Sequence, residues 1–300
     1  MIELQDQYDC FYFVAEWHAL TTAYEETQEL AKSSREIVLE WLASGIDSEK
    51  VTIYRQSDVP EVAELSMYLS MITPVSWLER NPTYKEMMKE LSGKDIATLG
   101  FLGYPVWQTA DIIIVHAELV PVGEDQLPHL EIAREIVRRF NNLYGDYFPE
   151  PQALLSEARR VPGTDGRKMS KSFDNAVYLS DPPDVVWDKI RTMMTDPARV
   201  RRTDPGTPEI CPVYHLHKIY DPQNTELVAH NCRTAGWGCI ECKRLLADHL
   251  IPHLAKIQER KKELASDPGL VDRVLERGAE RVRSIAGETI REVRSRLHLR

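Results

Sequence analysis

Two apolar runs decide the fold: Cys-Phe-Tyr-Phe-Val-Ala at residues 10–15 and Val-Thr-Ile-Tyr at residues 51–54. Both runs are short, rich in aromatic or β-branched residues and closed by polar ones, which is typical of buried strands. Between them, Thr27–Leu42 carries apolar residues at helical spacing, and Gly45 marks the end of this helix. The order strand, helix, strand predicts a parallel sheet covered by helices.

The same alternation continues further along the chain. Helical patterns cover residues 60–73 and 84–92, and Pro105 suits the first turn of a helix that runs to about His116. Glu118–Gly123 is then predicted as a strand that leads into a helix over Gln126–Asn141.

After residue 180 the spacing of apolar residues becomes helical up to the C-terminus, and turn residues cluster at Leu179–Pro183. We therefore predict an α/β protein: a Rossmann-like, doubly wound parallel sheet in residues 1–180, followed by an all-helical domain in residues 181–300.

The composition is that of a soluble globular protein. Of the 300 residues, 43% are hydrophobic and 28% are charged, which excludes a disordered or fibrous chain. No apolar run reaches the ~18 residues that a membrane span needs. The acidic N-terminus has no basic region of the signal-peptide kind, so we expect a cytoplasmic protein.

The net charge of −10 argues against a general nucleic-acid binder. The charge is uneven, however: residues 201–300 hold 18 basic and 14 acidic residues, whereas residues 1–200 hold 19 and 33. A local surface for a polyanion is one interpretation, and basic residues that coat exposed helices are the other. The candidates for such a surface are Arg199, Arg201, Arg202, Arg233, Lys243 and Arg244.

The segment Gly163-Thr-Asp-Gly-Arg-Lys-Met-Ser-Lys-Ser172 carries the strongest chemical signal. Lys168 and Lys171 lie three residues apart on a loop with two glycines, an arrangement suited to charge that develops on a phosphate chain. Ser170 and Ser172 could donate to the same oxygens. Two lysines on a loop are usually only solvated surface, but the spelling KMSKS after GTDGR resembles the second signature of class I aminoacyl-tRNA synthetases.

A second motif follows the predicted strand at Glu118–Gly123. Gly123 would let the backbone approach a ligand at the carboxyl edge of the sheet, where open parallel sheets bind nucleotides. Asp125 could accept from ribose hydroxyls, and Gln126 could donate to a carbonyl or phosphate oxygen. Asp111 is an acidic residue on an otherwise apolar helix, where it could instead be a cap or a buried hydrogen-bonding group.

The stretches YPVWQTAD (104–111), VPVGEDQ (120–126) and GTDGRKMSKS (163–172) occur in an order that resembles the tryptophanyl-tRNA synthetases. The resemblance implies that Asp111 accepts the indole N–H of tryptophan, so that the site refuses phenylalanine. It implies a tryptophan site formed by Asp111, Tyr104, Gln108, Gln126 and His18. It implies ATP-binding residues at Gly123, Glu124, Asp125, Val161, Lys168, Met169, Ser170, Lys171 and Ser172, of which Lys168, Ser170, Lys171 and Ser172 would also be catalytic and act with Mg²⁺. Gln108 departs from the Met that many bacterial members carry.

Four cysteines are spaced Cys211-x20-Cys232-x6-Cys239-x2-Cys242. Clustered thiols in a reducing compartment point to a metal, and four thiolates suit either zinc or a [4Fe–4S] cluster. Some bacterial tryptophanyl-tRNA synthetases carry a similar motif, with two more residues in the first spacer, that binds [4Fe–4S]. The resemblance therefore implies a [4Fe–4S] cluster, with zinc as the alternative.

The sequence contains no H-x-G-H, the first signature of class I synthetases. Met1–Gln7 resembles the end of the helix that would follow that signature, so we expect an N-terminal truncation. The alternative is a member that has lost activation.

The predicted function is activation of tryptophan with ATP and its transfer to tRNA(Trp) by a homodimer, with residues 60–100 as the predicted interface. Three alternatives stay open: a non-catalytic tryptophan- or tRNA-binding paralogue, a tyrosyl-tRNA synthetase, and an iron–sulfur redox or sensor protein.

Overall fold

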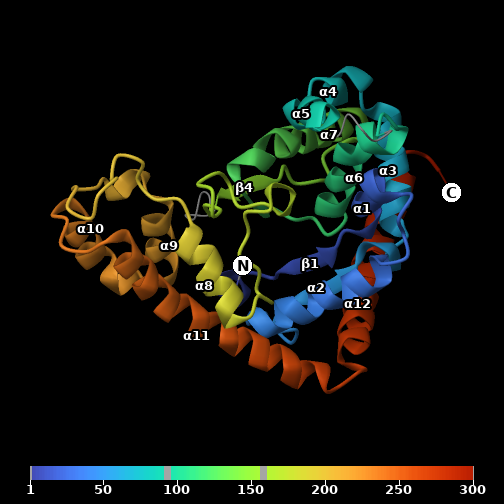
Figure 1. The fold of residues 1–300 in the computed structure, drawn as a ribbon. Helices are drawn as coiled ribbons and strands as arrows, with labels where there is room; N and C mark the ends of the chain where they lie inside the picture. Colours follow the sequence, from blue (N-terminus) through green and yellow to red (C-terminus); the bar gives the residue numbers. More distant parts are fainter. Residues whose placement is uncertain (1, 91–95, 156–160, 300) are drawn as a thin grey trace. The chain divides into compact units, whose positions relative to one another are not determined.

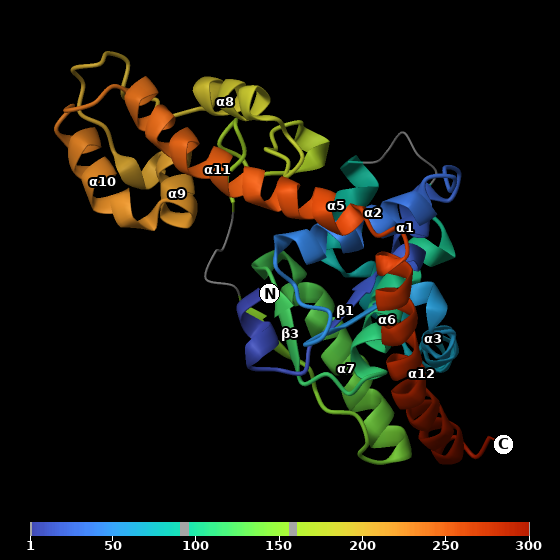
Figure 2. The same ribbon diagram turned by 90° about the horizontal axis from the view of Figure 1, so that it is seen from below.

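The chain is described here by a computed structural model that covers residues 2–90, 96–155 and 161–299 (Figures 1 and 2). It divides into two compact units: Met1–Ser156 together with Leu264–Arg300, and Glu157–Glu263. This division does not coincide with the boundary expected near residue 180. The KMSKS loop falls in the second unit, and the last helix belongs to the first.

Strands of the first unit pair in parallel. β1 (Phe11–Val14) pairs with β2 (Thr52–Arg55), and β3 (Leu119–Val122) pairs with β4 (Gln152–Leu155). The predicted parallel strands are thus confirmed. β4, whose sequence is only Gln-Ala-Leu-Leu, was not predicted, because four residues without alternation or β-branching carry almost no strand signal.

Helices connect and cover these strands in the first unit. Two short 3₁₀ segments, η2 (Gln56–Asp58) after β2 and η3 (Glu124–Gln126) after β3, carry candidate site residues. The helices are α1 (Glu16–Ala23), α2 (Leu30–Ser44), α3 (Glu61–Ile72), α4 (Val75–Glu79), α5 (Pro82–Glu90), α6 (Leu99–Ile113), α7 (Leu127–Tyr144) and α12 (Leu270–Arg296). Residues 91 and 92 of the helical pattern predicted over 84–92 lie outside the described residues.

The predicted position of Pro105 in the first turn of its helix is wrong. Pro105 lies inside α6 rather than in the first turn, because the helix begins six residues earlier, at Leu99. Thr98 caps that start: its side chain accepts a hydrogen bond from the Phe101 N–H at 3.1 Å. The helix therefore continues across the proline at the cost of one backbone hydrogen bond.

The helix α12 packs against β2, although its sequence lies in the region predicted to be a separate helical domain. Gly278 makes this approach possible, since a Cβ there would lie 1.9 Å from the carbonyl oxygen of Ile53. The apolar stripe along α12 showed that one face is buried, but periodicity does not say against which partner.

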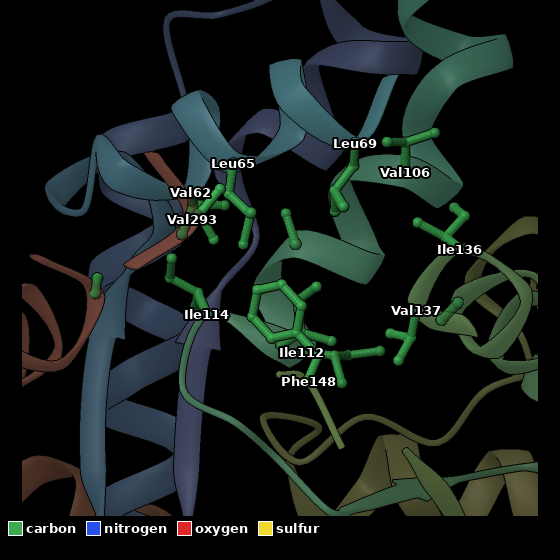
Figure 3. Close-up of a cluster of buried hydrophobic side chains, with 14 of the residues drawn as sticks. Val62, Leu65, Leu69, Val106, Ile112, Ile114, Ile136, Val137, Phe148 and Val293 are labelled. Carbon is green, nitrogen blue, oxygen red and sulfur yellow. The ribbon is translucent and has the colours of Figure 1, made fainter. Parts of the chain in front are cut away.

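The core of the first unit lies among α3, α6, α7 and α12 (Figure 3). Its side chains are aliphatic for the most part, and Figure 3 shows them converging from these helices. This packing fixes α6, and with it the polar residues that α6 carries. Members of the cluster include Val62, Leu65, Leu69, Val106, Ile112, Ile114, Ile136, Val137, Phe148 and Val293.

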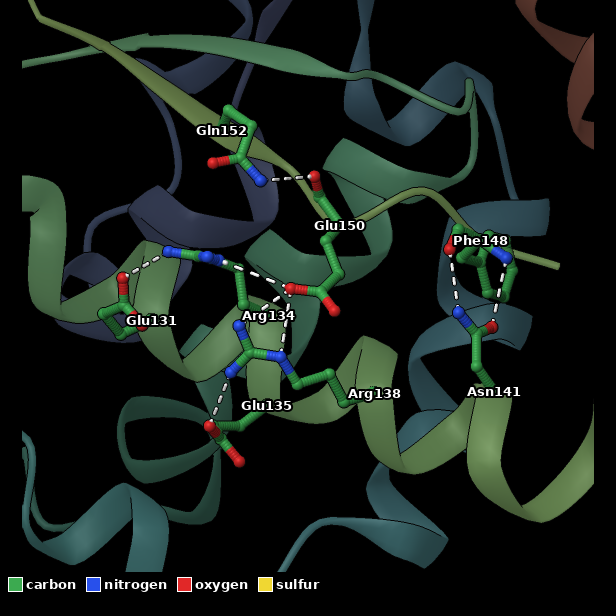
Figure 4. A network of polar contacts seen from close by, with 8 residues as sticks. All are labelled: Glu131, Arg134, Glu135, Arg138, Asn141, Phe148, Glu150 and Gln152. Carbon is green, nitrogen blue, oxygen red and sulfur yellow. Dashed lines mark hydrogen bonds and ion pairs between the residues drawn. The ribbon is translucent and has the colours of Figure 1, made fainter. Parts of the chain in front are cut away.

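A polar network fastens the segment before β4 to α7 (Figure 4). Arg138 donates to Glu150 from Nε at 3.0 Å and from a terminal nitrogen at 2.8 Å. Asn141 brackets Phe148 by donating to its carbonyl oxygen at 2.9 Å and accepting from its N–H at 3.1 Å. These contacts hold β4 in register with β3, whose carboxyl end carries the nucleotide-binding candidates.

The second unit consists mainly of α8 (Pro183–Thr192), α9 (Pro212–Tyr220), α10 (Thr225–Arg233) and most of α11 (Cys239–Ala265). Its core includes Val186, Ile190, Leu216, Leu246 and Leu250. The predicted helical character of this region is confirmed. None of the helices in the described ranges is both long and apolar enough to pass through a membrane.

Candidate functional site

Asp111 lies deep in the first unit. Its side chain projects from α6 and has 0% exposed surface, and it lines a cavity of about 410 Å³ together with Phe13 and Tyr54 of β1 and β2. Burial raises the pKa of Asp111 well above its usual range, and a hydrogen bond from Gln56 opposes that shift. A buried carboxyl group in a cavity is a candidate acceptor for a polar hydrogen of a ligand.

Gln56, which sequence reasoning missed, joins Asp111 to His18. Its Nε2 lies 2.9 and 2.8 Å from the two Asp111 oxygens and 3.1 Å from His18 Nδ1. The structure therefore brings His18 and Asp111 together, with 3.8 Å between Nδ1 and the nearest carboxylate oxygen. Burial lowers the pKa of His18. A glutamine directly after a strand gives no distinctive signal in one sequence.

Tyr104 lies on α6, seven residues before Asp111, so both project from nearly the same face of the helix. Its hydroxyl is hydrogen-bonded to Nε2 of His129 on α7, and burial is the main cause that raises the pKa of Tyr104 to about 12. His129 is buried, and no described residue satisfies its Nδ1. It was not predicted. Gln108, also on α6, is half-buried.

The candidates after β3 lie on η3, at the carboxyl end of that strand. Glu124 and Asp125 are exposed, whereas Gly123 and Gln126 are half-buried. Gln126 donates to Asp125 at 3.3 Å. A Cβ at Gly123 would lie 2.6 Å from an Asp125 oxygen, so glycine allows the carboxylate to turn back over the backbone.

The KMSKS loop of the second unit is a short hairpin. Val161 accepts from the Met169 N–H at 2.9 Å, and Pro162 pairs with Lys168 in an antiparallel bridge. Gly166 has a φ of +81°, and the turn that joins Pro162 to Lys168 requires this left-handed conformation. Lys168 and Lys171 are exposed and Ser170 is half-buried. The side chain of Ser172 lies outside the part of the chain that the structure describes.

Asn175, a second residue that sequence reasoning missed, organises this loop. Its buried side chain accepts from the Ser170 N–H at 2.8 Å and donates to Asp165 at 2.7 Å and to the Lys168 carbonyl oxygen at 3.1 Å. Gly163 is required here, because a Cβ would lie 2.3 Å from the Asn175 amide. The loop thus presents its lysines from a fixed backbone.

The four cysteines are brought together in the second unit. Cys211, Cys232, Cys239 and Cys242 line one small cavity of about 20 Å³ with Arg199. Burial and the three other thiols raise the pKa of Cys242 to about 12. Within the described residues, however, no group of three or more His, Cys, Asp or Glu side chains is arranged to hold a metal ion.

Arg199 lies beside these thiols and was predicted only as part of a basic surface. It donates to Cys232 Sγ at 3.9 Å and to the carbonyl oxygen of Trp237. Its Nε is buried and finds no hydrogen-bond partner among the described residues. Four thiols and an unsatisfied guanidinium N–H have the donor chemistry that an anionic metal–thiolate group needs.

Known proteins are similar to this chain over almost its whole length. The family model for class I tRNA synthetases (W and Y) matches residues 1–255. A tryptophan–tRNA ligase of Thermotoga maritima is 50% identical, and the match covers 99% of this chain and 92% of the relative. One of Aquifex aeolicus is 41% identical over 99% of this chain and 93% of the relative.

Among solved structures, the tryptophanyl-tRNA synthetase of Campylobacter jejuni, crystallised with ADP and tryptophan, has a TM-score of 0.86 and 32% identity. The match covers 100% of this chain and 92% of that one. Coverage, identity and fold agree: the chain belongs to the class I tRNA synthetases of the tryptophan and tyrosine group.

Proposed function

We propose that this protein activates L-tryptophan with ATP and transfers the tryptophanyl group to tRNA(Trp). The observation that carries the proposal is the buried Asp111 carboxyl group, in a chain half identical to a tryptophan–tRNA ligase. The place of action is the cytoplasm, where ATP and tRNA meet.

In the activation step, a carboxylate oxygen of tryptophan attacks the α-phosphorus of ATP. The bond from that phosphorus to the β-phosphate oxygen breaks, so tryptophanyl-adenylate forms and pyrophosphate leaves. Mg²⁺, when bound, would supply further positive charge to the phosphates. In the transfer step, a hydroxyl of the terminal tRNA ribose attacks the carbonyl carbon and AMP leaves. Neither step makes a covalent bond to the protein, so positioning and charge stabilisation are its tasks.

Each group of residues has one of these tasks. Asp111 accepts the indole N–H, and Tyr104, Gln108, Gln126 and His18 line the tryptophan site. Gly123, Glu124 and Asp125 bind the nucleotide with Val161 and Met169. Lys168 and Lys171, with Ser170 and Ser172, stabilise the negative charge that builds up on the leaving pyrophosphate.

The test is tryptophan-dependent exchange of pyrophosphate into ATP. We expect exchange with tryptophan and none with tyrosine, because the tyrosine hydroxyl, although a donor, lies beyond the para carbon and not where the indole N–H meets Asp111. Exchange with tyrosine would favour the tyrosyl enzyme. Tryptophan or tRNA binding without exchange would favour the non-catalytic paralogue.

The helices α8 to α11 are proposed to bind the anticodon region of tRNA(Trp). Of the basic residues predicted for such a surface, this part of the chain holds Arg199, Arg201, Arg202, Arg233 and Arg244. The prediction was wrong for Lys243, which is buried and donates to the carbonyl oxygens of Arg191 and Met193. Phosphate contacts make binding dependent on salt. Arg201→Ala should therefore weaken tRNA binding at 50 mM salt and reduce its salt dependence.

We further propose a [4Fe–4S] cluster on Cys211, Cys232, Cys239 and Cys242, with zinc as the alternative. The support is the shared cavity and the unsatisfied Arg199 Nε beside it. The cavity has room for about one water molecule, so binding a cluster requires the thiols to move apart. The cluster would shape the anticodon-binding region. Electron transfer independent of ATP would favour the redox alternative.

Metal analysis of protein purified without oxygen separates these cases. Four iron and four acid-labile sulfide per chain support the cluster, and one zinc per chain supports the alternative. Cys239→Ser should lose the metal in either case, whereas Cys10→Ser, at a buried cysteine directly before β1, should keep it.

A homodimer is proposed through α3, which lies in the predicted interface of residues 60–100, and through α1 and α6, which extend that interface beyond the predicted residues. These helices line an apolar cavity of about 710 Å³ with Trp17, Met67 and Trp107, and Met71 and Leu99 are largely exposed. Such an apolar patch on one face suits a second copy of the chain. Residues 91–95 of the predicted interface lie outside the described residues. Light scattering should find a dimer, and Leu99→Glu should give a monomer, whereas Leu143→Glu on α7 should not.

A further inference from the structure

Gln56 lies between the buried Asp111 and the half-buried His18 of the proposed tryptophan site, and its own side chain is fully buried. We propose that Gln56 is the positioning residue of this site. It holds His18 in the tautomer that carries its proton on Nε2, and it presents the Asp111 carboxylate as a hydrogen-bond acceptor. The inference rests on the proposed function, in which His18 and Asp111 contact tryptophan.

Two contacts fix the orientation of the Gln56 amide independently. The backbone N–H of Trp17 lies at 3.0 Å from one end, and since that group can only donate, this end is the oxygen. The two Asp111 oxygens lie at 2.8 and 2.9 Å from the other end, and since at least one of them can only accept in either protonation state, that end is the nitrogen. Both contacts give the same orientation.

The orientation of the amide decides the tautomer of His18. His18 Nδ1 lies 3.1 Å from Gln56 Nε2 and 3.4 Å from Gln56 Oε1. The nearer atom is a donor, so Nδ1 must accept and the ring proton must be on Nε2. That Nε2 is buried, with no hydrogen-bond partner in the described part of the chain. A buried N–H without an acceptor is a group that a ligand can satisfy, and tryptophan brings a carboxylate.

The charge state of Asp111 depends on the same amide. Burial of Asp111 favours the protonated form, and the hydrogen bond from Gln56 favours the carboxylate. The titratable groups that face it are His18 on α1 and Tyr54 on β2, and Asp9, His116 and Glu118 line the same cavity. Without the Gln56 donor, Asp111 would take up its proton at a higher pH and become a weaker acceptor.

Nuclear magnetic resonance of the full chain with ¹⁵N-labelled histidine tests the tautomer without any ligand. We expect His18, assigned by its loss in His18→Gln, to show a bare Nδ1 and a protonated Nε2 at pH 8. A protonated Nδ1 would overturn the proposal.

Gln56→Met tests the role in binding, because methionine has a similar length and no donor. We expect the KM for tryptophan to rise about tenfold, as for loss of one hydrogen bond to a charged group, with kcat little changed. The pH below which kcat/KM falls should move upward. Gln152→Met, at an exposed glutamine of β4, should change neither value.

These results separate the inference from the function on which it rests. If Asp111→Ala loses discrimination for tryptophan but Gln56→Met leaves the KM and the pH profile unchanged, the positioning role of Gln56 is wrong and the function stands. If Asp111→Ala keeps discrimination, the proposed tryptophan contact is wrong, whatever the tautomer of His18.

Discussion

The Asp111 site and the KMSKS loop both carry ionisable side chains, but those of the first are buried and those of the second are exposed to solvent. Asp111 has 0% exposed surface and is held by side chains from neighbouring elements. Lys168 and Lys171 are exposed on a hairpin whose order comes from its backbone and from Asn175. The Asp111 carboxyl group is therefore shielded from water, whereas the ammonium groups of Lys168 and Lys171 are solvated.

This difference assigns different work to the two regions. A buried acceptor loses much more when its partner is absent than an exposed one, so burial gives selectivity. Exposed lysines gain little from a phosphate in water, so they contribute most when negative charge develops close to them in the transition state. The Asp111 site should therefore decide which amino acid reacts, and the loop should decide how fast.

The largest expected effect is the loss of discrimination at Asp111. We expect the wild-type chain to prefer tryptophan by on the order of 10⁴ over the analogue in which sulfur replaces the ring N–H. Asp111→Ala should bring this ratio close to one. The ratio of kcat/KM in pyrophosphate exchange measures it, and circular dichroism checks the fold. A ratio that stays in the thousands would separate selectivity from the buried carboxyl group.

The loop lysines should show the opposite kinetic pattern. Lys171→Ala removes a charge that, in the proposed mechanism, acts on the leaving pyrophosphate, so kcat for exchange should fall about 10²-fold to 10³-fold. The KM for tryptophan should stay within about twofold. Lys256→Ala, at an exposed lysine of α11, serves as the control and should change neither. A rise in the KM for tryptophan without a fall in kcat would contradict the division of work.

The two regions are alike in how far the sequence predicted them. The motif spelling located Asp111, Lys168 and Lys171 because contiguous residues carry it. Gln56 and Asn175 were missed, since each acts on residues that are close in space and lie in other segments of the sequence. A single sequence does not record such contacts.

The fold shows the same limit. β1, β2 and β3 were predicted from local patterns, and the parallel pairing followed from the helices between them. The placement of α12 could not be predicted, because its apolar stripe fits any apolar partner equally well. Gly278 lets α12 approach Ile53. In the sequence alone, it is only a glycine inside a helix, which is expected to weaken that helix.

A smaller effect is expected from the backbone that presents the lysines. Gly163→Ala would place a Cβ 2.3 Å from the Asn175 amide, so either the loop or Asn175 must shift. We expect kcat for exchange to fall about tenfold, with tryptophan binding unchanged. Gly287→Ala, where a Cβ on α12 meets nothing within 4 Å, is the matched control. Equal rates for the two variants would mean that the loop tolerates displacement.

The smallest effect concerns stability and pH at Asp111. Because burial raises the pKa of Asp111 in the folded chain above its ordinary value of 3.8, the folded state binds this proton more tightly than the unfolded state. The stability from this group is complete below about pH 4 and is lost as the pH rises through the folded-state pKa. Asp111→Asn has no proton to lose at this position. The Tm of this variant minus the Tm of the wild type should therefore increase from pH 4 upward and then level off. Asp248→Asn, at an exposed carboxylate of α11, should show no such trend. A Tm difference for Asp111→Asn that decreases with pH would mean that Gln56 and its neighbours hold the carboxylate more strongly than burial penalises it.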